Sequence, residues 1–410
     1  MAAILMAVVA MVLSGGVGTA MAGPAASAPA SAPSAKRDFK EYPTTLWKLH
    51  TDLDEAMVME AQVRLNALAE EFSARTRGFG GTGIRSRLGF WLYSRAEDYH
   101  AGGGPPGSAG LYKGDVLMAM ASKDRGKGLW HTVQHEAFHQ FAHKTISAKL
   151  PIWINEGMAD YFGEGLWTGD RMVTGVIPPA RLKRIRALIK EGTLLDFEKM
   201  TQMEHKEWNQ DLQLRNYDQA WSMVHFLLHA YDGANAQKFG QYAMDVSRGQ
   251  SPKSAFAKHL GRDMKGFQKL YTDWWTSLDD NPTAELYNQA AVETLTSFLA
   301  RGKFMRLTFA DWDGFKAAAA GGKLAVDIRR FPGLYLPESL LEDALKACEK
   351  LVAQDAKFEL GAVGAGARVK LTTADGTLYV GSYELTPKDV KSVSVTVTKP
   401  RPVTTKPAGK

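Results

Sequence analysis

The sequence predicts an α+β fold, in which a small amino-terminal sheet packs on helices and a smaller α/β module follows. Short apolar runs of strand length, separated by turn residues, occur before residue 122. Stretches with helical spacing dominate residues 130–278. Clear alternation of apolar and polar residues returns near the carboxyl end, in the run SVSVTVT at residues 392–398. Strands followed by a block of helices are typical of the α+β class.

Length and composition are those of a globular protein. The 410 residues allow two or three domains, and a hydrophobic fraction of 45% gives each of them a core. The formal net charge of +6 is small for this length, so we expect no nucleic-acid partner. Basic residues cluster at residues 181–190, where a solvated helix face is the simpler explanation. The single cysteine, Cys348, excludes an intramolecular disulfide and a cysteine-based metal site.

The amino-terminal segment predicts export. Residues 1–22 are apolar and end in Ala20-Met21-Ala22, which is typical of signal-peptide cleavage. An uncleaved membrane anchor is the alternative, because the segment lacks basic residues at its start and is long enough to span a bilayer. Residues 23–38 are rich in Pro, Ala and Ser and predict a tether. We therefore expect a secreted, periplasmic or cell-envelope protein with no membrane span after cleavage.

Residues 39–280 form the predicted main domain. Its first long helix is expected to begin at a cap formed by Asp52 and to end near Phe72. Residues 101–110, which read AGGGPPGSAG, predict an irregular loop. Strands are expected at residues 47–50, 90–94 and 116–122, and further helices at residues 130–143, 155–162, 180–190, 217–231, 234–246, 254–260 and 264–278.

Residues 284–399 are expected to form the separate carboxyl-terminal module, followed by a disordered tail at 400–410. Asp375-Gly376 predicts a hairpin turn, because this pair tolerates the positive φ that such turns require. The module is the expected contact to a partner at the cell envelope. Helices are predicted at residues 284–300 and 337–353, and strands at 368–371, 378–383 and 392–398.

The segment His135-Glu136-Ala137-Phe138-His139 is the strongest chemical signal in the chain. Residues four apart lie on the same face of a helix, so His135 and His139 point the same way. Two neutral imidazoles at this spacing suit a zinc ion, with Glu136 beside them as a candidate base. The five-residue pattern is only moderately specific by itself, and a third ligand has to support it.

Glu156 is the expected third ligand. It stands seventeen residues after His139, beyond a turn at Leu150-Pro151 that lets a second helix pack back against the first. A catalytic zinc site needs three protein ligands and one open position. A buried histidine pair on an amphipathic helix is the alternative, and it leaves the correctly spaced Glu156 unexplained.

From His135 to Asp160 the sequence resembles the gluzincin metallopeptidases. The H-E-x-x-H segment followed by N-E-G-x-A is similar to the core of the M1 aminopeptidase-like and thermolysin-like branches, and to secreted bacterial gluzincin-like proteins. The resemblance implies a zincin-like fold and one zinc ion per chain, with His135, His139 and Glu156 as ligands. It also implies that Glu136 is the general base and acid.

Two supporting residues follow from the same resemblance. Asp160 would accept the outer N–H of His135 and fix its tautomer. Tyr217, about sixty residues past Glu156, would stabilise the oxyanion of the transition state. A packed core tyrosine is the alternative for Tyr217.

Four further histidines have simpler explanations. His225 and His229 are also four apart, but their apolar flanks favour buried, hydrogen-bonded side chains, one of which could still help the oxyanion. His131 and His143 flank the zinc-binding motif and are interpreted as incidental.

These observations predict an exported zinc-dependent metallopeptidase that hydrolyses peptide or protein substrates with Glu136 as the base. The run at residues 114–120 lacks the Glu-Asn that binds the free amine in M1 aminopeptidases, so an aminopeptidase specificity is not implied. Instead we expect this strand to be an edge that hydrogen-bonds an extended peptide. The alternative is a zincin-fold binding or scaffold protein at the cell envelope with weak or no turnover. Glu136 favours the enzyme, because an inactive site has no need of a base.

Overall fold

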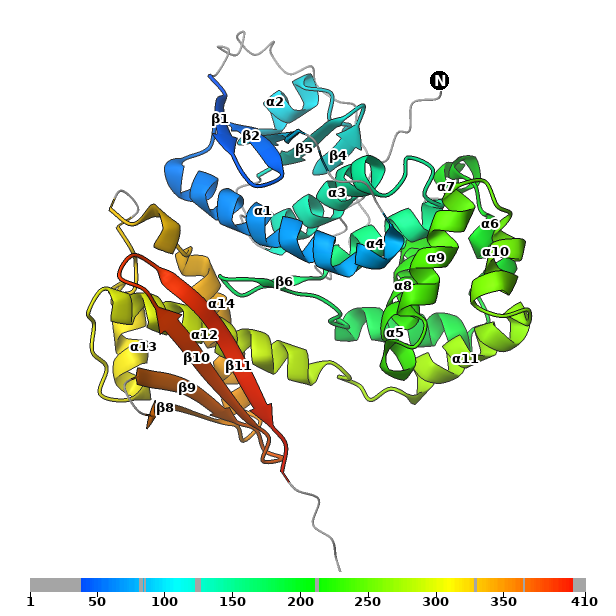
Figure 1. Ribbon diagram of the computed structural model, residues 1–410. Helices are drawn as coiled ribbons and strands as arrows, with labels where there is room; N and C mark the ends of the chain where they lie inside the picture. Colours follow the sequence, from blue (N-terminus) through cyan, green and yellow to red (C-terminus); the bar gives the residue numbers. More distant parts are fainter. Residues whose placement is uncertain are drawn as a thin grey trace, which may run out of the picture.

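The computed structural model describes residues 38–80, 84, 86–121, 127–210, 214–327, 330–363 and 366–400. Its architecture is α+β, as predicted, with a sheet near the amino end, a helical middle and a second sheet near the carboxyl end (Figure 1). The expected signal peptide or anchor, most of the tether and the tail lie outside the described residues. Within the described part, no helix combines the length and the apolar character needed to cross a membrane.

The first sheet has five strands in the order β1-β2-β3-β5-β4. The strands are β1 (Lys40–Pro43), β2 (Trp47–Thr51), β3 (Leu88–Tyr93), β4 (Gly110–Lys113) and β5 (Val116–Met120). Strands β2, β3 and β5 run parallel, whereas β4 is antiparallel to β5 and forms the edge. The expectation that the strand at residues 114–120 forms an edge is therefore wrong. Strand β4 covers that side, and it begins inside the segment that was expected to be a loop.

Helices cover both faces of this sheet. Helix α1 (Glu55–Arg75) and helix α3 (Lys127–Thr145) pack on one face, and the short α2 (Ala96–Ala101) packs on the other (Figure 1). The cap of α1 is Asp54, whose carboxylate accepts a hydrogen bond from the N–H of Met57 at 3.0 Å. The prediction of Asp52 as the cap is wrong. Asp52 instead accepts hydrogen bonds from the backbone and hydroxyl of Ser94, at 2.9 and 2.5 Å.

The helical middle of the chain begins at α3 and packs around α4. Helix α4 lies between α3 and α8, and its approach to α8 depends on Gly157 (Figure 1). A Cβ atom at Gly157 would lie 2.5 Å from the carbonyl oxygen of Ala220, so only glycine fits. The helices after α3 are α4 (Ile152–Gly163), α5 (Pro179–Lys190), α6 (Phe197–Gln202), α7 (His205–Gln210), α8 (Leu214–Gly233), α9 (Ala236–Ser247), α10 (Pro252–His259) and α11 (Met264–Ser277).

The carboxyl-terminal part packs a long helix on an antiparallel sheet of order β11-β10-β9-β8. The expected Asp375-Gly376 turn joins β9 to β10, and Gly376 has a φ of +82°. The valines of β11 are half-buried while its serines and threonines are exposed, as alternation predicts for an edge strand. The elements are α12 (Ala284–Phe304), α13 (Trp312–Ala320), α14 (Glu338–Val352), β8 (Lys357–Val363), β9 (Gly366–Thr372), β10 (Leu378–Leu385) and β11 (Val390–Thr398).

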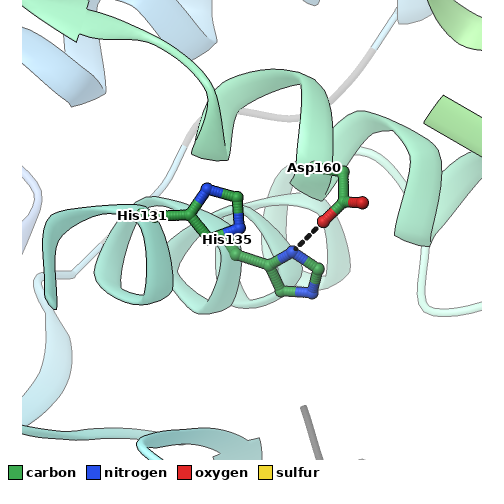
Figure 2. A group of neighbouring side chains, drawn as sticks. All are labelled: His131, His135 and Asp160. Carbon is green, nitrogen blue, oxygen red and sulfur yellow. Dashed lines mark hydrogen bonds and ion pairs between the residues drawn. The ribbon is translucent and has the colours of Figure 1, made fainter. Parts of the chain in front are cut away.

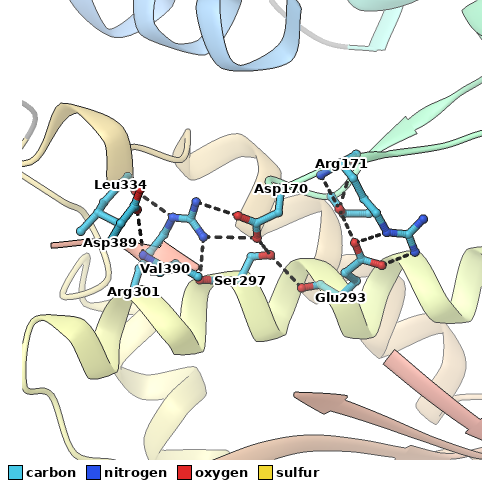
Figure 3. Close-up of polar contacts among 9 residues, drawn as sticks. Asp170, Arg171, Glu293, Ser297, Arg301, Leu334, Asp389 and Val390 are labelled. Carbon is cyan, nitrogen blue, oxygen red and sulfur yellow. Dashed lines mark hydrogen bonds and ion pairs between the residues drawn. The ribbon is translucent and has the colours of Figure 1, made fainter. Parts of the chain in front are cut away.

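A small hairpin joins the two parts of the molecule. It consists of β6 (Leu166–Trp167) and β7 (Met172–Val173) and follows directly after α4. Figure 3 shows the turn of this hairpin lying on α12, with Asp170 facing Arg301 and Arg171 facing Glu293. The shortest contacts of the two pairs are 3.1 and 2.5 Å, and the side chain of Glu293 is fully buried. The polar contacts therefore fix the segment after α4 to the carboxyl-terminal part.

Candidate metal centre

Three donor atoms converge where α3 meets α4. His135 and His139 lie one turn apart on α3, and Glu156 lies on α4. The Nε2 atoms of His135 and His139 lie 3.4 and 3.6 Å from the same carboxylate oxygen, Oε2 of Glu156. Zinc–ligand bonds of about 2.0–2.1 Å place two corners of a tetrahedron about 3.4 Å apart. The separations therefore suit a single tetrahedral ion.

The burial of these atoms supports a bound ligand. The side chains of His135, His139 and Glu156 are at most 3% exposed. Among the described residues, neither Nε2 atom nor either carboxylate oxygen of Glu156 has a hydrogen-bond partner. Buried polar atoms are rarely left without one, because each costs free energy. Imidazole nitrogens and a carboxylate are donors that zinc prefers, so the three residues fit this ion.

The surrounding charges stabilise a cation at this position. Burial alone lowers the pKa of His135, but the hydrogen bond to Asp160 and the negative charges of Asp160 and Glu156 outweigh it and raise the pKa to about 10. A raised imidazole pKa marks a place where positive charge is favourable. A divalent cation bound by the same groups would experience the same attraction.

Asp160 fixes the orientation of His135. Its Oδ1 atom lies 2.9 Å from Nδ1 of His135 (Figure 2), and its Oδ2 atom lies 2.8 Å from Nη2 of Arg181. Burial tends to raise the pKa of Asp160, but Arg181 and the hydrogen bond from His135 hold it well below its usual range. An ionised Asp160 accepts a hydrogen bond from the Nδ1–H of His135, so in the neutral imidazole Nε2 carries the lone pair and faces the candidate metal position beside Glu156.

His131 lies beside the same pair but does not form an equally good site. The donor atoms of His131, His135 and Asp160 lie within 4.8 Å of one another (Figure 2). The carboxylate of Asp160 already bonds His135 and Arg181, so a cation there would face the guanidinium. The group that contains Glu156 has no such competitor among its described contacts.

The edge strand β4 holds the carboxylate of Glu136. The backbone N–H of Tyr112 donates to Oε2 at 2.8 Å, while Oε1 is buried without a hydrogen-bond partner among the described residues. Burial raises the pKa of Glu136. The close approach needs a glycine at Gly110, where a Cβ atom would lie 2.9 Å from Cγ of Glu136 and 2.5 Å from a methyl carbon of Thr132. Thus Oε2 of Glu136 is held by a hydrogen bond, whereas Oε1 is able to accept one from a bound molecule.

His143, interpreted from the sequence as incidental, anchors this strand. Its Nδ1 atom lies 2.6 Å from the hydroxyl of Tyr112. Lys144 forms an ion pair with Asp115 at 2.5 Å in the turn that follows β4. These contacts bind β4 to the last turns of α3.

Tyr217, at the start of α8, is a half-buried neighbour of the centre. Its ring packs edge-on against Trp208, with ring centroids 5.1 Å apart. Burial raises the pKa of Tyr217 well above its usual range, and the charges of Glu156, Asp160 and Glu136 raise it further. The hydroxyl therefore stays protonated and is able to donate a hydrogen bond.

His205 is a neighbour that the sequence analysis missed. Its Nδ1 atom is buried without a hydrogen-bond partner among the described residues. Burial lowers the pKa of His205, and the carboxylate of Glu156 and the imidazole of His139 also act on it. It begins α7, a helix of six residues that is too short to produce a periodic pattern.

The second histidine pair lies within the core, as its apolar flanks indicated. Nε2 of His225 lies 3.0 Å from the carbonyl oxygen of Gly175, and Nε2 of His229 lies 3.0 Å from the hydroxyl of Tyr161. Burial lowers the pKa of His225 to about 3 and that of His229 to about 4. Both side chains are therefore neutral and structural at neutral pH.

A family model matches this region of the chain. Residues 130–247 match a family described as "Protein of unknown function (DUF1570)". The matched segment contains the donor atoms on α3 and α4 and continues through α8 to the end of α9. No curated protein matches the chain. The similarity thus falls on the candidate centre but assigns no chemistry to it.

Proposed function

We propose that the chain is a zinc-dependent metallopeptidase of the gluzincin type, exported by its amino-terminal segment. The observation that carries the proposal is the convergence of donor atoms from His135, His139 and Glu156 beside the unpaired oxygen of Glu136. When bound, a zinc ion supplies a Lewis acid that makes a water molecule acidic near neutral pH and polarises a carbonyl group.

Glu136 is the proposed general base and acid. Its Oε2 atom is held by the N–H of Tyr112, so the carboxylate cannot rotate freely. Its Oε1 atom is available to accept a proton from water and to pass that proton to the leaving amine. Because burial raises the pKa of Glu136, the protonated form is accessible nearer to neutral pH than in an exposed glutamate.

Tyr217 is the proposed donor to the oxyanion that forms as a peptide carbonyl is attacked. Its pKa is raised by burial and by the neighbouring carboxylates, so it donates rather than ionises. A neutral donor is suited to this role because it stabilises the developing negative charge without adding a charge to the buried site.

An extended peptide is the proposed substrate. Strand β4 is an edge of the sheet and lies beside Glu136, and sheet edges bind extended peptides through backbone hydrogen bonds. The N–H of Tyr112 is already bonded to Glu136, so the peptide would use other backbone groups of β4.

Burial of the site favours a second candidate function. The side chains of His135, Glu156 and His139 are 1%, 0% and 3% exposed, which restricts access by a polypeptide. A zinc-binding scaffold at the cell envelope, with a partner on the carboxyl-terminal part, would have the same ligands without turnover.

Digestion of an unbiased peptide library separates the two candidates. Purified wild type and Glu136→Gln would be compared by mass spectrometry, with bound zinc measured in both. The peptidase proposal predicts cleavage by wild type, loss of cleavage in the variant and equal zinc in both. Zinc in both proteins without cleavage by either would support the scaffold, and equal cleavage by both would exclude Glu136 as the base.

A further inference from the structure

Arg181 on α5 is a buried cation at the junction of α4, α5 and α8. Its Nη2 atom lies 2.8 Å from Asp160, and its Nε atom lies 2.8 Å from Glu164, which caps the carboxyl end of α4. Its Nη1 atom lies 3.9 Å from Asp218 on α8. The guanidinium also stacks over Trp221 at 5.1 Å, and Arg181 is 8% exposed.

This arrangement differs from the sequence-based expectation. Residues 181–190 were interpreted as a solvated basic face, yet Arg181 is buried among carboxylates. Its neighbour Arg184 binds Asp218 through both oxygens, at 2.5 and 2.8 Å. Two members of the basic cluster, Arg181 and Arg184, therefore neutralise buried acidic groups next to the candidate centre.

A guanidinium is required for these contacts. Its donors form a planar fork, so one group can hold Asp160 and Glu164 at the same time. An ammonium group is a point charge and does not reproduce the fork. Burying a cation is costly unless its partners are well placed, and here they come from two helices.

We propose that Arg181 is a positioning residue for the zinc centre, an inference that rests on the proposed function. By holding Oδ2 of Asp160, Arg181 leaves Oδ1 in place to accept the N–H of His135. This chain of contacts sets the ring orientation and tautomer of His135. Arg181 thereby acts on the metal through Asp160 without touching it.

Three substitutions at two positions of α5 provide the test. Arg181→Met removes the fork but keeps much of the apolar stem. Arg186→Met is the matched control, because Arg186 bonds Asp280 at 2.8 Å and also the carbonyl of Leu278, both of which follow α11. Arg181→Lys keeps the charge without the fork. Measurement of the unfolding transition of each variant in the presence of a chelator identifies any variant that fails to fold.

The readouts are zinc affinity, measured by competition with a chromophoric chelator, and the visible spectrum of the Co²⁺-substituted protein. We expect Arg181→Met to bind zinc about tenfold more weakly and to shift the Co²⁺ spectrum, since removal of an outer partner commonly costs 10–100-fold. We expect Arg181→Lys to lie between this variant and wild type, and Arg186→Met to match wild type.

The outcomes distinguish this inference from the proposed function. If wild type binds zinc and Arg181→Met has the same affinity and spectrum, Arg181 is not a positioning residue. If Arg186→Met loses as much affinity as Arg181→Met, the effect is a general one on the helix and the inference fails. Absence of zinc binding in wild type would overturn the proposed function itself.

Discussion

The backbone N–H of Tyr112 donates a hydrogen bond to Oε2 of Glu136 at 2.8 Å. This contact joins the edge of the sheet to the helix that carries both candidate histidine ligands. Because the donor is a backbone group, the position of β4, and not the side chain at residue 112, sets the orientation of the proposed base. The contact explains why a small residue at Gly110 and the anchoring pair of Tyr112 and His143 matter to the centre.

Gly110→Ala is expected to impair turnover while zinc is retained. The added methyl group would lie 2.5 Å from a methyl carbon of Thr132 and 2.9 Å from Cγ of Glu136, so either β4 or the side chain of Glu136 must shift. Displacement of the base by about 1 Å costs on the order of 10²-fold in rate. Gly89→Ala in β3 is the matched control, because a Cβ atom there meets nothing within 4 Å. Unchanged kcat in Gly110→Ala would contradict the assigned role of β4.

Tyr217→Phe is expected to lower kcat by about 10²-fold or more with little change in KM, as expected for the loss of one oxyanion donor. Zinc content should not change, because Tyr217 is not a proposed ligand. Tyr231→Phe, in the non-helical end of α8 where the residue is 52% exposed, is the control. Steady-state kinetics on a peptide identified from the library measures kcat and KM for both variants. An equal effect of the two substitutions would favour a packing role for Tyr217.

Arg301→Met is expected to destabilise the fold. The side chain of Arg301 is 5% exposed and pairs with Asp170 in the hairpin after α4 (Figure 3). Breaking a buried pair costs about 3 kcal/mol, because the remaining charge is left without its partner. Lys399→Met removes an exposed pair with Glu285 and should not change stability measurably. Urea unfolding of the two variants measures the difference, and equal midpoints would show that the hairpin contact is weak.

Stability should fall as the solution becomes acidic, and His225 should account for part of the loss. Its pKa is about 3 in the folded chain, against about 6.5 in an unfolded one. Below pH 6.5 the unfolded chain binds a proton that the folded chain does not. The contribution of His225 to the free energy of unfolding is therefore fully present above pH 6.5 and is lost progressively toward pH 3. The loss from His225 is about 2 kcal/mol at pH 5.

His225→Gln tests this assignment, because glutamine keeps a donor near the carbonyl of Gly175 without titrating. Unfolding is measured from pH 5 to 8 in chelator for both proteins, so that metal release contributes to neither. The variant should lose less stability than wild type between pH 8 and pH 5. Parallel pH profiles would show that His225 is not the group responsible.

The sequence predicted the features that depend on a periodic pattern within a single helix or strand. The long helices and the relative positions of Glu156 and Asp160, four apart on α4, follow from helical spacing. Features that depend on packing between distant segments were not predictable. Two acidic residues flank Leu53, and only the contact of Asp52 with Ser94 decides that Asp54 is the cap.

Other parts of the site were missed from the sequence for the same reason, because they depend on packing between distant segments. Strand β4 and helix α7 have four and six residues, too few for a period to be recognised. The burial of Arg181 depends on carboxylates from two other helices, so the local run of basic residues gave no sign of it.

Metal analysis of the purified protein tests the central claim most directly. Wild type, His139→Ala and Glu156→Gln would be purified without chelator, incubated with equimolar zinc, desalted and measured by elemental mass spectrometry. The account predicts about one zinc per wild-type chain and much less in both variants, because each loses one of three ligands. Wild type without zinc, or variants that retain as much as wild type, would contradict it.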